Sequence, residues 1–116
     1  MSEREWLFYI EDMISFAENV LIYTSDMDKE TFVSSKLNYD ATLRNLELIG
    51  EAATHIPDKV RSTNDAIEWR LIIATRHRLI HGYLGIDNDT LWSIIKDDVP
   101  HLLLELRKMD FTLLNK

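Results

Sequence analysis

The chain has 116 residues, of which 46% are hydrophobic and 28% charged, with a formal net charge of −7 and no cysteine. This composition predicts one folded domain over residues 1–116. It excludes a disordered chain, a disulfide framework and a cysteine-based zinc site. The acidic balance argues against broad, non-specific binding of nucleic acid. No apolar run is long enough to cross a bilayer and residues 1–5 lack the features of a signal peptide, so we expect a cytoplasmic protein without a membrane partner.

Positive charge is concentrated in one segment of this acidic chain. The first 50 residues carry 4 Lys or Arg against 10 Asp or Glu. Residues 61–81 reverse that balance, with four arginines against two acids before His77 and His81 are counted. This pattern indicates a local anion-binding site within an acidic protein.

Helices are expected along the whole chain, because it contains only 3 Gly and 2 Pro and no segment alternates convincingly over the length of a strand. Apolar residues recur at helical spacing over residues 4–24. A polar break follows at residues 25–28, and a short helical turn is expected around residues 30–35. The second long helix covers residues 37–56 and ends before Pro57, which forbids simple continuation.

Two further helices are expected in the second half of the chain. Residues 63–65 offer N-cap side chains for a third helix that stops at Gly82. A fourth helix begins after Asp87 or Asp89, and Pro100 inside it should bend it about one turn earlier. Together the four long helices predict an all-α, up-and-down four-helix bundle.

Arg76 is the anomaly of the third helix, because its neighbours three and four positions away are large and apolar. A guanidinium in that position is unfavourable unless an anion meets it. A phosphate suits it, because arginine can bind one through two bonds. A carboxylate from the second helix, such as Glu47 or Glu51, would instead make Arg76 a structural residue. The apolar neighbours are Ile72, Ile73, Leu79 and Ile80.

His81 follows Arg76 by five residues and supplies a side chain that can take up and return a proton near neutral pH. In an ideal helix the two side chains point about 140° apart. They converge only if the helix tightens or ends at Gly82, or if a second copy of the chain adds its own site across a dimer interface. The dimer would also cover the apolar stripe around Arg76.

The spacing Arg-x-x-x-x-His-x-Tyr at Arg76, His81 and Tyr83, on the third helix of a small all-α domain, resembles the HEPN fold. The stretch Ile-Gly-Glu-Ala at residues 49–52 is similar to part of the second helix of the HEPN toxins that are paired with minimal nucleotidyltransferase antitoxins. The resemblance covers residues 9–109. Together the two motifs and the chain length make the resemblance fairly specific.

The resemblance implies the toxin component of a toxin–antitoxin system: a metal-independent endoribonuclease that acts as a homodimer on RNA and needs no cofactor. Arg76 would hold the scissile phosphate and stabilise the charge of the transition state. His81 would be the general acid or base, and such chemistry spares DNA because DNA lacks the 2′-hydroxyl. His77 and Arg78 would assist phosphate binding.

The resemblance also gives Tyr83 a role as a modification site. The nucleotidyltransferase antitoxin would transfer AMP from ATP to the Tyr83 hydroxyl. This modification would place bulky negative charge beside Arg76 and His81 and so block the RNA phosphate.

Simpler roles remain open for these residues. A histidine at the end of a helix is favoured by the helix dipole alone, and Tyr83 could be an interface or core aromatic. His77 and His81 have the spacing of two metal ligands, but no zinc-protease motif accompanies them and a third ligand would have to come from elsewhere, so we expect no metal. For the whole chain, the alternative is a non-catalytic helical module that binds a nucleotide or a protein partner.

Overall fold

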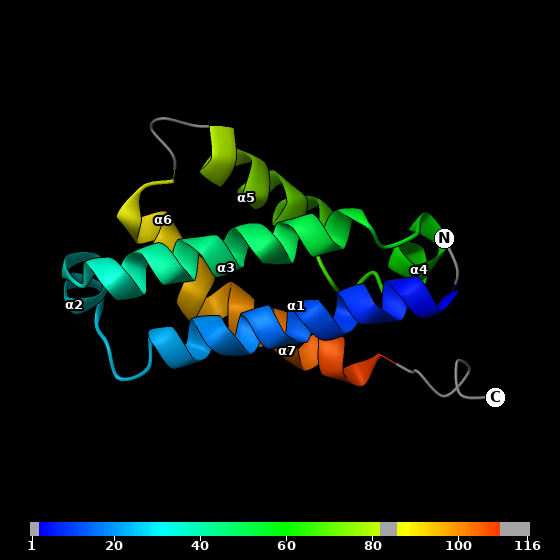
Figure 1. Ribbon diagram of the computed structural model, residues 1–116, viewed down its shortest axis with the longest axis horizontal. Coiled ribbons are helices and arrows are strands. Elements are labelled where there is room, and N and C mark those ends of the chain that lie inside the picture. The colour runs from blue at the N-terminus through cyan, green and yellow to red at the C-terminus, as the bar shows by residue number, and fades with distance from the viewer. Residues whose placement is uncertain (1–2, 82–85, 110–116) are drawn as a thin grey trace.

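The computed structural model describes residues 3–81 and 86–109, and these residues form helices and no strands (Figure 1). The predicted all-α fold is therefore confirmed. In chain order the elements are α1 (Glu3–Tyr23), α2 (Lys29–Ser34), α3 (Lys36–Thr54), α4 (Asp58–Thr63), α5 (Trp69–His81), α6 (Asn88–Ser93), the π-helical turn η1 (Ile94–Asp98) and α7 (Val99–Lys108).

Helix α3 lies at the centre of the bundle, with α1 packed along one side, α5 along the other, and α7 against α1 (Figure 1). The core forms where the apolar stripes of α1, α3 and α7 meet. Completely buried side chains in this core come from all three helices and include Ile10, Met13, Ala17, Ala53 and Leu106.

The third long helix begins later than its sequence suggests, and the expected N-cap at residues 63–65 is wrong. Pro57 occupies the N-cap of a short additional helix, α4, and Asn64 is the C-cap of α4. A proline fits this position because its fixed backbone angle suits the start of a helix. Arg61 of α4 donates from Nη2 to the carbonyl of Ala53 at 2.9 Å, which satisfies a group at the end of α3.

The fourth long helix and its N-cap are confirmed, and the irregularity expected before Pro100 takes the form of a π-helical turn. Asp87 is its N-cap, and the carboxylate accepts a hydrogen bond from the Thr90 amide at 2.8 Å. Pro100 has no N–H to offer the carbonyl four residues earlier. Just before it, the helix widens into η1, where the Val99 amide donates to the carbonyl of Ile94. The expected stop of the third helix at Gly82 lies outside the described residues.

Helix α5 is the least covered of the long helices. Trp69 is its only buried residue, whereas Leu71 is 47% and Ile80 is 44% exposed. Among the described residues, no helix is long and apolar enough to span a membrane.

Candidate active site

Helix α5 crosses α3 very closely at the point where Arg76 meets Gly50. A Cβ atom built on Gly50 would lie 2.3 Å from the Cβ of Arg76 and 3.1 Å from its Cγ and Cδ. Two non-bonded carbon atoms cannot lie 2.3 Å apart, so any larger residue at position 50 would push the helices apart. The missing side chain of Gly50 therefore allows Arg76 to lie against the backbone of α3.

The anion that meets Arg76 within the chain is Glu51. Its Oε2 atom lies 2.7 Å from Nη2 of Arg76. The other candidate, Glu47, pairs instead with Arg44 on its own helix at 3.2 Å. The Nε atom of Arg76 is buried and finds no hydrogen-bond acceptor among the described residues. Arg76 is thus held on one side, and part of its donor set is left unused.

Glu51 also connects Arg76 to two aromatic rings. Its Oε1 atom lies 3.4 Å from Nε2 of His55, which is four residues later at the C-cap of α3. The ring of His55 stacks on Tyr9 of α1, with centroids 4.4 Å apart and planes 9° apart. Contacts among four residues therefore link α1, α3 and α5: Tyr9, Glu51, His55 and Arg76.

His55 was missed as a candidate from the sequence, where its position on a helix surface carries no clear signal. The spacing of Glu51 and His55, four residues apart on one helix, is the pattern that could have linked them. The contact between Glu51 and Arg76 depends on how α3 and α5 pack, which helical spacing alone does not reveal.

His77 and His81 lie together on an exposed side of α5, with ring centroids 4.6 Å apart. Helix α5 keeps its α-helical form through His81, so within the described residues it does not tighten to bring His81 toward Arg76. No contact joins Arg76 and His81 within one copy. Arg78 is exposed beside them and forms no ion pair with the described residues.

Two of the remaining predictions concern Tyr83 and metal binding. Tyr83 lies outside the described residues. Residues 3–81 and 86–109 contain no group of three or more His, Cys, Asp or Glu side chains that could hold a metal ion. His77 and His81 therefore have no third ligand there.

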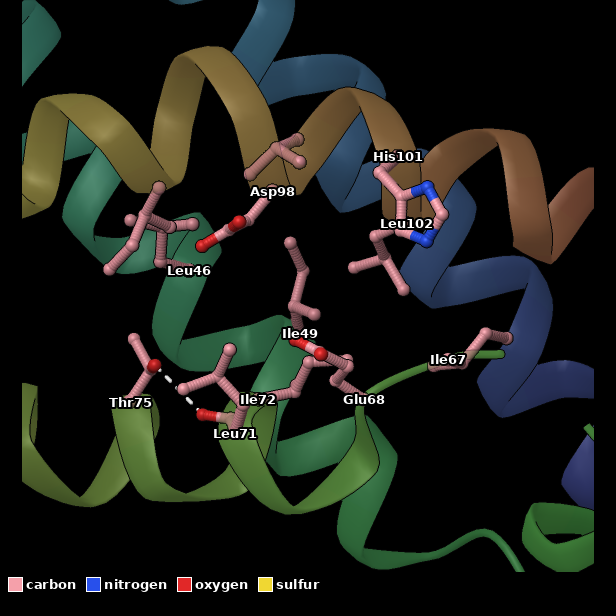
Figure 2. A pocket seen from close by; sticks show the side chains of 12 residues that line it. Leu46, Ile49, Ile67, Glu68, Leu71, Ile72, Thr75, Asp98, His101 and Leu102 are labelled. Atoms are coloured by element: carbon pink, nitrogen blue, oxygen red, sulfur yellow. Dashed lines mark hydrogen bonds between the residues drawn. The ribbon is translucent and has the colours of Figure 1, made fainter. Parts of the chain in front are cut away.

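A separate apolar pocket lies between α3, α5 and the segment from η1 to α7 (Figure 2). Its volume is about 70 Å³, and its lining includes none of Arg76, His77 and His81. Two carboxylates, those of Glu68 and Asp98, join its apolar walls (Figure 2). Partial burial, followed by the nearby charges of Glu68 and Asp97, raises the pKa of Asp98. Because its chemistry is apolar and acidic, this pocket does not suit a phosphate.

The residues described so far define a small all-α bundle with an anchored arginine and an exposed histidine on the same helix. The chain belongs to the HepT-like ribonuclease family, whose model, described as "Ribonuclease HepT-like", matches residues 10–109. The family predicted from the Arg-His-Tyr spacing is therefore confirmed, and with it the ribonuclease class.

Two relatives cover almost the whole chain. "Putative RNase MJ1380" of Methanocaldococcus jannaschii is 36% identical over 106 residues, which are 91% of this chain and 97% of the relative. "Probable ribonuclease HepT" of Thermococcus cleftensis is 35% identical over 101 residues, or 87% of this chain and 92% of the relative. No solved structure matches the chain.

Replacing Gly50 with alanine should destabilise the fold by about 1–3 kcal/mol, because the new methyl group overlaps Cβ of Arg76 and forces α3 and α5 apart. Helix propensity alone predicts the opposite sign, a gain of about 1 kcal/mol. Chemical denaturation of the two proteins measures the difference. Equal or greater stability of Gly50→Ala would contradict the close crossing.

Replacing Asp98 with asparagine should stabilise the protein slightly at pH 7, by about 0.5 kcal/mol or less because the site is partly solvated. The folded state raises the pKa of Asp98, so folding disfavours its charged form. Its contribution to stability is complete below the ordinary pKa of 3.8 and is lost as the pH rises through the raised value. Thermal unfolding should show a benefit at pH 7 that disappears below about pH 4. A variant less stable than wild type at pH 7 would contradict this.

Proposed function

We propose that this protein is the toxin of a toxin–antitoxin pair and cleaves RNA as a metal-independent endonuclease. The observation that carries the proposal is the state of Arg76 in a member of a ribonuclease family: Glu51 holds its guanidinium against α3, and the side chain is still 29% exposed. A partly exposed, pre-oriented arginine is suited to bind a phosphate and to stabilise the charge that develops on it.

In the proposed reaction the ribose 2′-oxygen attacks the adjacent phosphorus and the bond to the 5′-oxygen breaks. Arg76 binds the non-bridging oxygens and stabilises the added negative charge of the pentacoordinate transition state. His81 removes the proton from the 2′-hydroxyl or delivers one to the leaving 5′-oxygen. His77 and Arg78, both exposed beside His81, contact neighbouring phosphates of the RNA.

We propose that the active form is a homodimer in which Arg76 and His81 of two copies face one cleft. The regular course of α5 supports this, because it leaves the two residues on different sides of one helix. Ile80, which is 44% exposed and follows Arg76 by four residues on the same side of α5, gives a second copy an apolar side chain to cover.

Regulation in this proposal acts through Tyr83, two residues after His81 in the sequence. A cognate minimal nucleotidyltransferase antitoxin transfers AMP from ATP to the tyrosine hydroxyl and releases pyrophosphate. The added phosphate is negatively charged and lies close in sequence to the two proposed catalytic residues. It therefore competes with the RNA phosphate and silences the enzyme.

Substitutions of Arg76 and His81 test the nuclease. Wild-type protein incubated with cellular RNA in the presence of a chelator should give discrete cleavage products, and Arg76→Ala and His81→Ala should each lower the rate by at least about 100-fold. Arg44→Ala and His101→Ala are matched controls, because these residues lie outside the proposed site and should leave cleavage unchanged.

Gel analysis of the products and intact-mass measurement of the protein complete this experiment. Absence of cleavage by wild-type protein that carries no adduct on Tyr83 would contradict the nuclease. It would favour a non-catalytic module that binds a nucleotide or partner through its basic helix.

Substitution of Tyr83 tests the regulation. Incubated with the nucleotidyltransferase and ATP, the wild-type chain should gain the mass of one or more AMP units and lose its cleavage activity. Tyr83→Phe should gain no mass and stay active, because it lacks the acceptor hydroxyl, whereas Tyr23→Phe should behave like wild type. Mass spectrometry and the cleavage assay read the two effects, and a Tyr83→Phe protein that is still silenced would refute the modification site.

A further inference from the structure

We propose that Glu51 is a positioning residue for the nuclease site: its carboxylate orients the Arg76 guanidinium, and His55 stacked on Tyr9 holds that carboxylate in place. This role rests on the proposed function, since it concerns how Arg76 is presented to the RNA phosphate.

The first argument comes from how firmly Arg76 is held. Three arginine–carboxylate ion pairs form among the described residues, and their arginine side chains are 29% exposed for Arg76, 54% for Arg107 and 67% for Arg44. Arg76 is therefore the least exposed of the three arginines, although Glu51, at 48%, is as open to solvent as Glu18, at 46%. The Arg76 pair also connects two helices, so it fixes Arg76 relative to α3 and not only to its own turn.

The second argument concerns which donors of Arg76 stay available. Glu51 engages Nη2, and Nε is buried away from solvent without an acceptor among the described residues. The exposed part of the side chain therefore lies elsewhere, and a phosphate arriving from solvent is left with the outer donors on Nη1 and Nη2. Without Glu51, the long side chain would be free to turn and present other edges.

The third argument is that both oxygens of the Glu51 carboxylate have partners. Oε2 faces Arg76 of α5, and Oε1 faces His55, which in turn stacks on Tyr9 of α1. The contact with Arg76, at 2.7 Å, is the closer of the two, and the contact with His55, at 3.4 Å, adds a weaker restraint on rotation of the carboxylate. The preceding residue, Gly50, brings α5 close enough for the ion pair to form. Residues from three helices, α1, α3 and α5, therefore contribute to the orientation of Arg76.

The negative charge of Glu51 also has an unfavourable effect, which is on the binding of RNA. A carboxylate beside a phosphate-binding arginine repels RNA, so it weakens binding of the substrate while it orients Arg76 for the transition state. Removing the charge without changing the shape should therefore separate the two effects. A residue that only supported the fold would lower the amount of active protein and leave the kinetic constants of the folded molecules unchanged.

The test compares Glu51→Gln with Glu47→Gln, which removes the same charge one turn away from a pair that does not include Arg76. For Glu51→Gln, kcat should fall by about 10- to 100-fold. Its affinity for a single-stranded 2′-deoxy oligonucleotide, which lacks the attacking hydroxyl, should stay equal to that of wild type or increase. Glu47→Gln should match wild type in kcat. Thermal unfolding corrects each rate for the fraction of folded protein.

A second readout needs no cleavage. The N–H resonance of Arg76 Nε, assigned by its loss in Arg76→Lys, should shift in Glu51→Gln and not in Glu47→Gln. An unchanged resonance would overturn the proposed contact and with it the role of Glu51.

The kinetic outcomes separate this inference from the proposed function. If wild-type protein cleaves RNA and Glu51→Gln retains its kcat, or loses activity only in proportion to its folded fraction, Glu51 is not a positioning residue and the nuclease stands. If wild-type protein cleaves no RNA, the proposed function is rejected, and the catalytic role of Glu51 with it.

Discussion

The close crossing of α3 and α5 at Gly50 is the constraint on which the rest of the site depends. Because Gly50 has no side chain, the backbone of α3 can approach Cβ of Arg76, and the next residue of α3 then lies within reach of the guanidinium. Two consecutive residues of α3 thus accommodate Arg76: Gly50 allows the close packing, and Glu51 provides the counterion. An arginine among isoleucines and leucines is tolerated here because its counterion is part of the helix on which it packs. Moving α5 outward by the width of one methyl group would weaken both effects together.

The regular geometry of α5 determines what one copy of the chain can do alone. Arg76 faces α3, whereas His81 lies with His77 on an exposed side, and no kink in the described part of the helix brings them together. A single copy of the proposed enzyme therefore does not bring the proposed phosphate-binding residue, Arg76, and the proposed proton-transfer residue, His81, together. Ile80 is exposed on the same helix, so in the proposed homodimer an apolar contact and the two proposed catalytic residues would lie on one element.

Much of this architecture follows from local signals in the sequence. The four long helices and the Asp87 cap are readable from apolar spacing and capping chemistry, and Pro100 marks the irregular turn at η1. Helix α4 was missed because Pro57 was interpreted only as a stop, although proline is equally suited to begin a helix. Arg76 stands out by its apolar neighbours, and two carboxylates could have met it. The choice of Glu51, and its contact with His55 and Tyr9, depend on how three helices pack and are not encoded in any one helical period.

The acidic character of the chain favours a nuclease that contacts only a few phosphates of its RNA substrate. With a net charge of −7, the protein as a whole repels a phosphate backbone, and its positive charge is concentrated on and beside α5. Glu51 adds a negative charge where binding affinity would favour its absence. Its presence is intelligible if the orientation of Arg76 in the transition state matters more than affinity for the substrate, because binding substrate and transition state equally well does not raise the rate of the chemical step. In the proposed reaction, lower affinity at this position would also ease release of the cleaved RNA, because the product phosphate lacks the added negative charge that Arg76 would stabilise in the pentacoordinate transition state.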